Sequence, residues 1–126
     1  MRLWHYQIII HLPRQQLLGQ HRECCALRGN GWGKKHATVN YIFKHHLYVL
    51  WNYHMKVINE MKNRGYTIDQ QWIDPSYRGK SCKRDSLDVF LEELYDYPEH
   101  NVEYLKECLM NLAGKDIVID EVKIRK

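Results

Sequence analysis

Residues 47–65 read LYVLWNYHMKVINEMKNRG, and this stretch decides the fold class. Its apolar side chains recur every three to four residues, at Leu47, Leu50, Trp51, Met55, Ile58 and Met61. This spacing places them on one face of an α-helix, and Gly65 provides the helix end. His54 lies on the same apolar face, so we expect a core histidine whose hydrogen bonds are satisfied. We interpret the stretch as the central helix of an all-α protein.

Two further helices are predicted from their end signals and apolar spacing. Pro13 suits a first helical position and Gly29 suits a stop, which predicts a helix over residues 13–28. Apolar residues recur at helical spacing from Val102 onward, and Gly114 closes that pattern.

The remaining segments are less regular. Residues 86–95 are predicted to form a shorter acidic helix, and residues 3–12 an extended lead. The aliphatic tail, residues 117–124, indicates a strand or an extended segment laid on the helices. A chain of 126 residues has the length of one domain with a real core. We therefore expect a compact single-domain bundle, residues 1–126.

Charge is distributed unevenly along the chain. Residues 1–84 carry 14 Lys and Arg against four carboxylates, a formal +10, whereas residues 85–126 carry a formal −6. Within the first 59 residues, Glu23 is the only carboxylate, among eight Lys or Arg and seven His. A basic front of this kind is typical of proteins that bind a polyanion, and nucleic acid is the first expectation.

Glu23 has two interpretations at this point. A lone carboxylate in a basic segment is a candidate general acid or base, or a group that stabilises a developing positive charge. The alternative is a surface ion pair with Arg22 or Arg28, which contributes little to stability. Gly19 lies one helical turn before Glu23, where either a ligand or plain helix packing would explain a glycine.

The basic loop Gly29–Lys35 is predicted to contact the DNA backbone through Lys34 and Lys35. It lacks the spacing of a P-loop. No apolar run is long enough to span a membrane, and the N-terminus lacks a signal-peptide core. The four cysteines do not form a disulfide framework, because two are adjacent and two stand alone, so a reduced cytoplasmic setting is expected. The pair His45-His46 is only a weak metal hint, and no metal or other cofactor is expected.

Motifs spread along the chain resemble those of the pyrimidine-dimer DNA glycosylase / AP-lyase family, the phage endonuclease V type. The resemblance covers residues 1–80 well and 97–113 loosely. The residues that carry it are Arg2, Leu17-Leu18, His21-Arg22-Glu23, Phe43, Leu47, Leu50, Ile58, Glu60, Arg64-Gly65-Tyr66, Pro75, Tyr77-Arg78-Gly79 and Tyr97-Pro98-Glu99-His100.

This resemblance implies an all-α domain with its N-terminal segment threaded between the helices. It also implies a metal-free DNA glycosylase with AP-lyase activity, in which the α-amine of Met1 forms a Schiff base with the sugar C1′. An α-amine titrates at about 7.7–8.0, so it is partly neutral where a lysine, at about 10.4, is not. Glu23 would stabilise the cationic sugar and move protons, while Arg2 and Arg22 would grip phosphates. Arg28 is a further candidate for DNA contact.

Several features depart from the family pattern. The Thr of the mature family N-terminus has no counterpart, Ala26 replaces an Arg, and the tail from Asp116 is acidic and aliphatic. We therefore expect a divergent, monomeric member that acts on double-stranded DNA, damaged or abasic, with pyrimidine dimers as one candidate lesion. The alternatives are a non-catalytic nucleic-acid-binding module on the same scaffold and a metal-dependent nuclease that uses the histidine-rich front.

Overall fold

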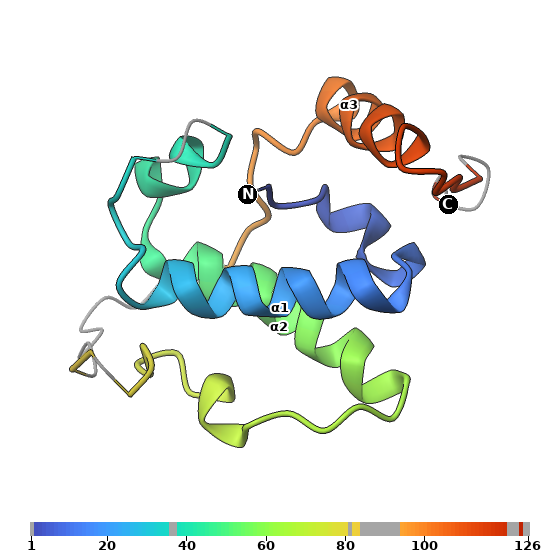
Figure 1. Ribbon diagram of the computed structural model, residues 1–126. Helices are drawn as coiled ribbons and strands as arrows, with labels where there is room; N and C mark the ends of the chain where they lie inside the picture. The colour runs from blue at the N-terminus through green and yellow to red at the C-terminus, as the bar shows by residue number, and fades with distance from the viewer. Residues whose placement is uncertain (1, 36–37, 81, 84–93, 121–123, 125–126) are drawn as a thin grey trace.

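The computed structural model describes residues 2–35, 38–80, 82–83, 94–120 and 124 (Figure 1). Within these residues the chain forms helices and no β-strand, which confirms the all-α prediction. None of the described helices has the length and apolar character needed to cross a membrane. The elements in chain order are η1 (Tyr6–His11), α1 (Arg14–Arg28), η2 (Asn40–Lys44), α2 (Leu47–Asn63), η3 (Gln70–Ile73) and α3 (Val102–Ala113), where η denotes a 3₁₀ helix.

Helices α1 and α2 pack against each other at the centre of the molecule (Figure 1). α1 begins directly after Pro13, and its last turn closes with hydrogen bonds from the Gly29 N–H to the carbonyls of Cys25 and Ala26. α2 ends where Gly65 adopts a φ of 84°, a conformation that favours glycine. Both helices lie within one residue of their predicted bounds.

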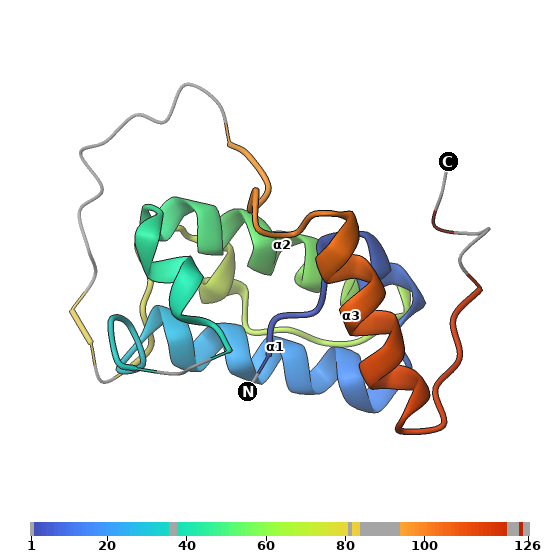
Figure 2. The same ribbon diagram turned by 90° about the horizontal axis from the view of Figure 1, so that it is seen from above.

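The N-terminal segment lies over the α1–α2 pair, and α3 packs on its other side (Figure 1 and Figure 2). Residues 2–5 are irregular, but Tyr6–His11 form the 3₁₀ helix η1, so the prediction of an extended lead over residues 3–12 is wrong for these six residues. The physical reason is a local cap: the Nδ1 of His5 accepts a hydrogen bond from the Gln7 N–H at 3.1 Å, which favours a turn at this point. The turn buries Ile8 and Ile9 and leaves Ile10 exposed.

α3 confirms the third predicted helix. Asn101 caps its N-terminus by accepting a hydrogen bond from the Tyr104 N–H, at 2.9 Å. Most of the predicted acidic helix over residues 86–95 lies outside the described residues, and Leu94 and Tyr95 are not helical. In the tail, residues 117–120 form no strand, as the extended alternative predicted.

Candidate active site

A pocket of about 370 Å³ lies between α1, the N-terminal segment and α3. It is lined by Arg2, Trp4, Gln16, Gly19, Gln20, Glu23, Thr38, Asn111 and Lys115. Among the described lining residues, Glu23 is the one carboxylate, and Arg2 and Lys115 are the cations. The structure therefore places the singular acid of the basic segment in a pocket beside positive charge.

One face of α1 forms the wall of this pocket. Gln16, Gly19, Gln20 and Glu23 share that face, because residues three and four apart lie together on a helix. A Cβ built at Gly19 would meet a single described group within 4 Å, the Arg22 Nη2 at 3.7 Å. Close packing of another described segment therefore does not explain this glycine, which leaves the wall open beside Glu23.

Glu23 itself is half-buried, and its Oε2 atom is fully buried. An ion pair with Arg28, one of the alternatives drawn from the sequence, is not formed. The terminal nitrogens of Arg28 bond elsewhere, and its Nε has no hydrogen-bond partner. Glu23 thus lies partly shielded from water in the pocket wall.

Gln20 fixes the start of the chain against the same wall. Its Nε2 donates to the Arg2 carbonyl at 3.0 Å, and its Oε1 accepts from the Trp4 N–H at 2.7 Å. The Tyr53 hydroxyl from α2 lies 2.9 Å from the same Oε1, and Gln20 is only 2% exposed. Met1 lies outside the described residues, but a peptide bond joins it to Arg2. The backbone of residue 2 is therefore held one helical turn from Glu23.

The Arg2 side chain lies between the N-terminal segment and α3. Its guanidinium is 6.0 Å from the Trp4 ring centre and 5.8 Å from that of Tyr104. Its Nη2 is 3.8 Å from a carboxylate oxygen of Glu107. The acidic C-terminal part, residues 85–126, thus meets the basic front at this point. Arg22 is exposed on the surface of α1.

The structure does not present Arg28, a predicted DNA contact, at the surface. Its side chain has 0% exposure. The guanidinium donates to three backbone carbonyls at 2.8 Å each and to the ring of His54 at 2.9 Å. The carbonyls belong to Trp72, Asp74 and Tyr77. Protein acceptors have replaced water around this cation, so Arg28 ties α1 to the segment at residues 72–77.

Lys34 and Lys35 are both exposed in the loop that follows α1. Gly33, just before them, has a φ of 78°, which favours glycine. Neither lysine lines the Glu23 pocket. Both side chains thus lie at the surface, outside the pocket that contains Glu23.

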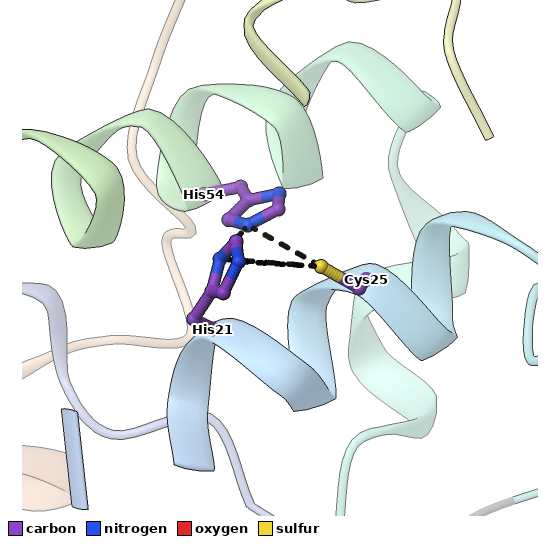
Figure 3. Close-up of side chains that lie close together, drawn as sticks. All are labelled: His21, Cys25 and His54. Atoms are coloured by element: carbon purple, nitrogen blue, oxygen red, sulfur yellow. Dashed lines mark hydrogen bonds between the residues drawn. The ribbon is translucent and has the colours of Figure 1, made fainter. Parts of the chain in front are cut away.

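Three side chains at the α1–α2 contact form a cluster that sequence reasoning missed (Figure 3). The Nδ1 of His21 lies 2.8 Å from the Nε2 of His54, and the Cys25 sulfur lies 4.0 Å from the same Nε2. Histidine and cysteine are common metal ligands, and these atoms lie within 4.8 Å of one another. The spacing of His21 and Cys25, four apart on a helix, was the available signal. The predicted pair at residues 45 and 46 takes no part.

The protons on this cluster argue against a metal site. Arginine has only donors, so the Arg28 Nη1, at 2.9 Å, must donate to the Nδ1 of His54. In a neutral ring the Nε2 of His54 then carries the proton and donates to the Nδ1 of His21. A ligand nitrogen needs its lone pair, and its ring partner ordinarily faces an acceptor rather than a cation. Burial, followed by the neighbouring Arg28 and His21, lowers the pKa of His54 well below its ordinary value. The expectation of a core histidine with satisfied hydrogen bonds is confirmed.

A family model described as pyrimidine dimer DNA glycosylase matches residues 1–74 of the 126. The chain belongs to the pyrimidine dimer DNA glycosylase family. The match covers more than half of the chain and confirms the family resemblance drawn from the sequence. No curated protein and no solved structure matches the chain.

Membership of the pyrimidine dimer DNA glycosylase family makes the chain an enzyme of DNA repair with DNA as its substrate. The matched residues include the whole α1 wall of the pocket and the N-terminal segment that Gln20 holds. The α3 side of the pocket, with Asn111, lies outside the match. The family region and the pocket around Glu23 thus coincide on two of its three sides.

Proposed function

We propose that this glycosylase removes a damaged base from double-stranded DNA and then cleaves the strand at the abasic site. The proposed nucleophile is the α-amine of Met1. The amine nitrogen bonds to C1′ as the bond from C1′ to the base breaks, and the base leaves with the electron pair. Loss of the amine proton and opening of the sugar give a Schiff base. The proton then lost from C2′ drives elimination of the 3′ phosphate.

The observation that carries this proposal is the Gln20 clamp. It holds the backbone of residue 2 against the face of α1 that also presents Glu23, which supports a reaction between the adjoining α-amine and a sugar bound in this pocket. Positioning of reacting groups supplies a large part of enzymatic rate. Arg2 is the next residue in the chain, and a nearby cation favours the neutral, nucleophilic form of an amine.

Glu23 has two roles in this mechanism. Its carboxylate stabilises the positive charge that develops on the sugar as the base leaves, and partial burial strengthens that interaction. It also moves protons during Schiff-base formation and elimination. Arg22, Lys34 and Lys35, which are exposed, hold phosphates of the bound duplex. The enzyme acts as a monomer.

Trapping with borohydride tests the proposal. The untagged protein is incubated with abasic and ultraviolet-irradiated duplexes and reductant, and a covalent protein–DNA adduct is expected on gel electrophoresis. A protein with extra residues before Met1 should bind the same duplex but give no adduct. Glu23→Gln should bind equally well and react about 10²–10⁴-fold more slowly in single turnovers.

Each alternative has its own result. An adduct of normal yield from the extended protein would show that a lysine is the nucleophile. Base release without any adduct would leave a glycosylase that lacks the lyase step. Single-turnover rates of Glu23→Gln within threefold of wild type would remove the carboxylate from the mechanism.

A further inference from the structure

A second hollow, of about 540 Å³, lies at the C-terminal end of α1. It is bounded by the loop after α1 and by the segment that carries Trp72 and Lys80. None of its lining residues also lines the Glu23 pocket. Neither the family match nor the proposed chemistry assigns a role to it.

The hollow is positively charged. Lys34, Arg78 and Lys80 line it, and its described lining includes no carboxylate. Cys25, which also lines it, adds no negative charge, because burial raises the pKa of its thiol to about 12. Lys34 and Lys80 are exposed, so their ammonium groups remain hydrated in the unliganded protein. The lining is suited to an anionic group.

Arg78 holds the two sides of the hollow together. Its Nε donates to the Arg28 carbonyl at 2.8 Å, and its Nη2 lies 3.4 Å from the Gly29 carbonyl. These two bonds, to carbonyls at the end of α1, use two of the five N–H donors of a guanidinium. These bonds hold the guanidinium of Arg78 in place at the edge of the hollow.

Trp72 gives the hollow a rigid apolar wall. Its ring centre lies 5.0 Å from the buried guanidinium of Arg28 and 4.7 Å from the ring of Tyr77, at a steep angle. Gly79 has a φ of 98°, and a Cβ there would stand 3.6 Å from the Cη2 of Trp72. Phosphates and sugars alternate along a nucleic-acid backbone. The cations of the hollow suit a phosphate, and the Trp72 ring beside them suits the adjoining sugar.

We propose that this hollow binds a phosphodiester of the same DNA duplex, away from the reacting nucleotide. Lys34, Lys80 and Arg78 hold the phosphate, and Trp72 packs against the adjoining deoxyribose. This inference rests on the proposed function for the identity of the ligand. It adds Arg78 and Lys80 to the DNA-contacting residues.

The position of the hollow along α1 indicates the course of the duplex. At 100° per residue, Cys25 is turned by about 200° from Glu23, whereas Ala26 is turned by only about 60°. The hollow therefore lies farther along α1 than the active pocket, at the C-terminal end of the helix, and reaches partly around it. A strand that reaches both passes over the loop Gly29–Lys35 at the helix end, which is where the exposed lysines lie.

Charge removal at Lys80 tests the assignment. Duplex affinity of Lys80→Gln is measured from about 50 to 200 mM salt, with Lys62→Gln as the control, an exposed lysine in the last turn of α2. Loss of one phosphate contact lowers the slope of log affinity against log salt by about 0.9, which corresponds to about threefold over this range. We expect that change in Lys80→Gln and none in Lys62→Gln. The control Lys62→Gln should also keep its single-turnover rate on saturating abasic duplex within twofold of wild type.

Equal salt slopes in the two variants would overturn the proposal. If 10 mM inorganic phosphate or deoxyadenosine monophosphate shifts the amide resonances of Gly29 and Lys80, while Lys80→Gln leaves duplex affinity unchanged, the hollow is a site for a small anion and the DNA assignment is wrong. Binding is measured without trapping. If Lys80→Gln lowers the salt slope as expected but the wild-type protein gives no borohydride adduct, the lyase mechanism is refuted. The assignment of the hollow as a DNA phosphate site would still stand.

Discussion

Buried neutral histidines should make this protein unusually sensitive to mild acid. Burial and the neighbouring His5 lower the pKa of His100 to about 3. The hydrogen bonds give the geometric reason. The Tyr6 N–H donates to the Nδ1 of His100 at 3.2 Å, so the neutral ring carries its proton on Nε2 and donates it to the Tyr41 hydroxyl. A second proton would have to point at the N–H of Tyr6. In the same way, Arg28 blocks the Nδ1 of His54.

The size of the effect follows from proton linkage. A histidine in the unfolded chain binds a proton with a pKa of about 6.5, and the folded His100 does not until about pH 3. Its contribution to stability is complete above pH 6.5 and is lost as the pH falls toward 3, at up to about 1.4 kcal/mol per pH unit. Between pH 7 and pH 5 this amounts to about 2 kcal/mol for His100, and His54 adds a loss of the same sign. The total free energy of unfolding of a typical domain is only about 5–15 kcal/mol.

Urea unfolding at pH 7, 6 and 5, followed by tryptophan fluorescence, measures this loss. The matched variant is His100→Gln, since a Gln side chain offers an acceptor for the Tyr6 N–H and a donor for the Tyr41 hydroxyl, and does not titrate. Its stability should fall by about 2 kcal/mol less than that of the wild type between pH 7 and pH 5. Carboxylates ordinarily titrate at about 4, so most of their contribution lies below this window. Parallel losses in the two proteins would refute the assignment of His100 as a buried neutral base.

Two further substitutions separate structural from functional roles. Gly19→Ala should raise the free energy of unfolding by about 0.5–1 kcal/mol, because the helix gains an alanine with no close contact. The added methyl group should also lower the single-turnover rate, because it intrudes into the pocket beside Glu23. Unchanged stability and an unchanged rate would show that the substrate does not contact the α1 wall of the pocket. Arg28→Lys should destabilise the protein by about 1–3 kcal/mol in urea unfolding, since an ammonium has three donors for four acceptors. The affinity of this variant for duplex DNA should not change. Weaker DNA binding by a variant of unchanged stability would support Arg28 as a DNA contact.

Local patterns in the sequence were sufficient for the helices and for the family. Helical spacing and end residues act over a few positions, so α1, α2 and α3 were predicted within a residue or two. The uneven charge predicted a nucleic-acid partner, the motif at His21-Arg22-Glu23 and the others along the chain gave the resemblance to a DNA-repair family, and the family match confirms that resemblance. The run Ile8–Ile10 was misread, because three successive apolar residues do not reveal the turn that the His5 side chain caps.

The roles of individual cations depended on tertiary structure. Arg28 and Arg22 are equivalent in a sequence, since each is an arginine near Glu23 in a predicted helix. Only the packing of residues 72–77 onto α1 supplies the acceptors that bury Arg28, while Arg22 stays at the surface.

The same holds for pairs that are distant along the chain. His21 meets His54 only because α1 and α2 pack against each other. The sequence by itself determined the helices, the family and the candidate acid, because these follow from residue type and short-range spacing. Tertiary structure decided which charges face the pocket, which are buried, and which nitrogen of His54 carries a proton, because burial and hydrogen bonding depend on contacts between segments that no local pattern encodes.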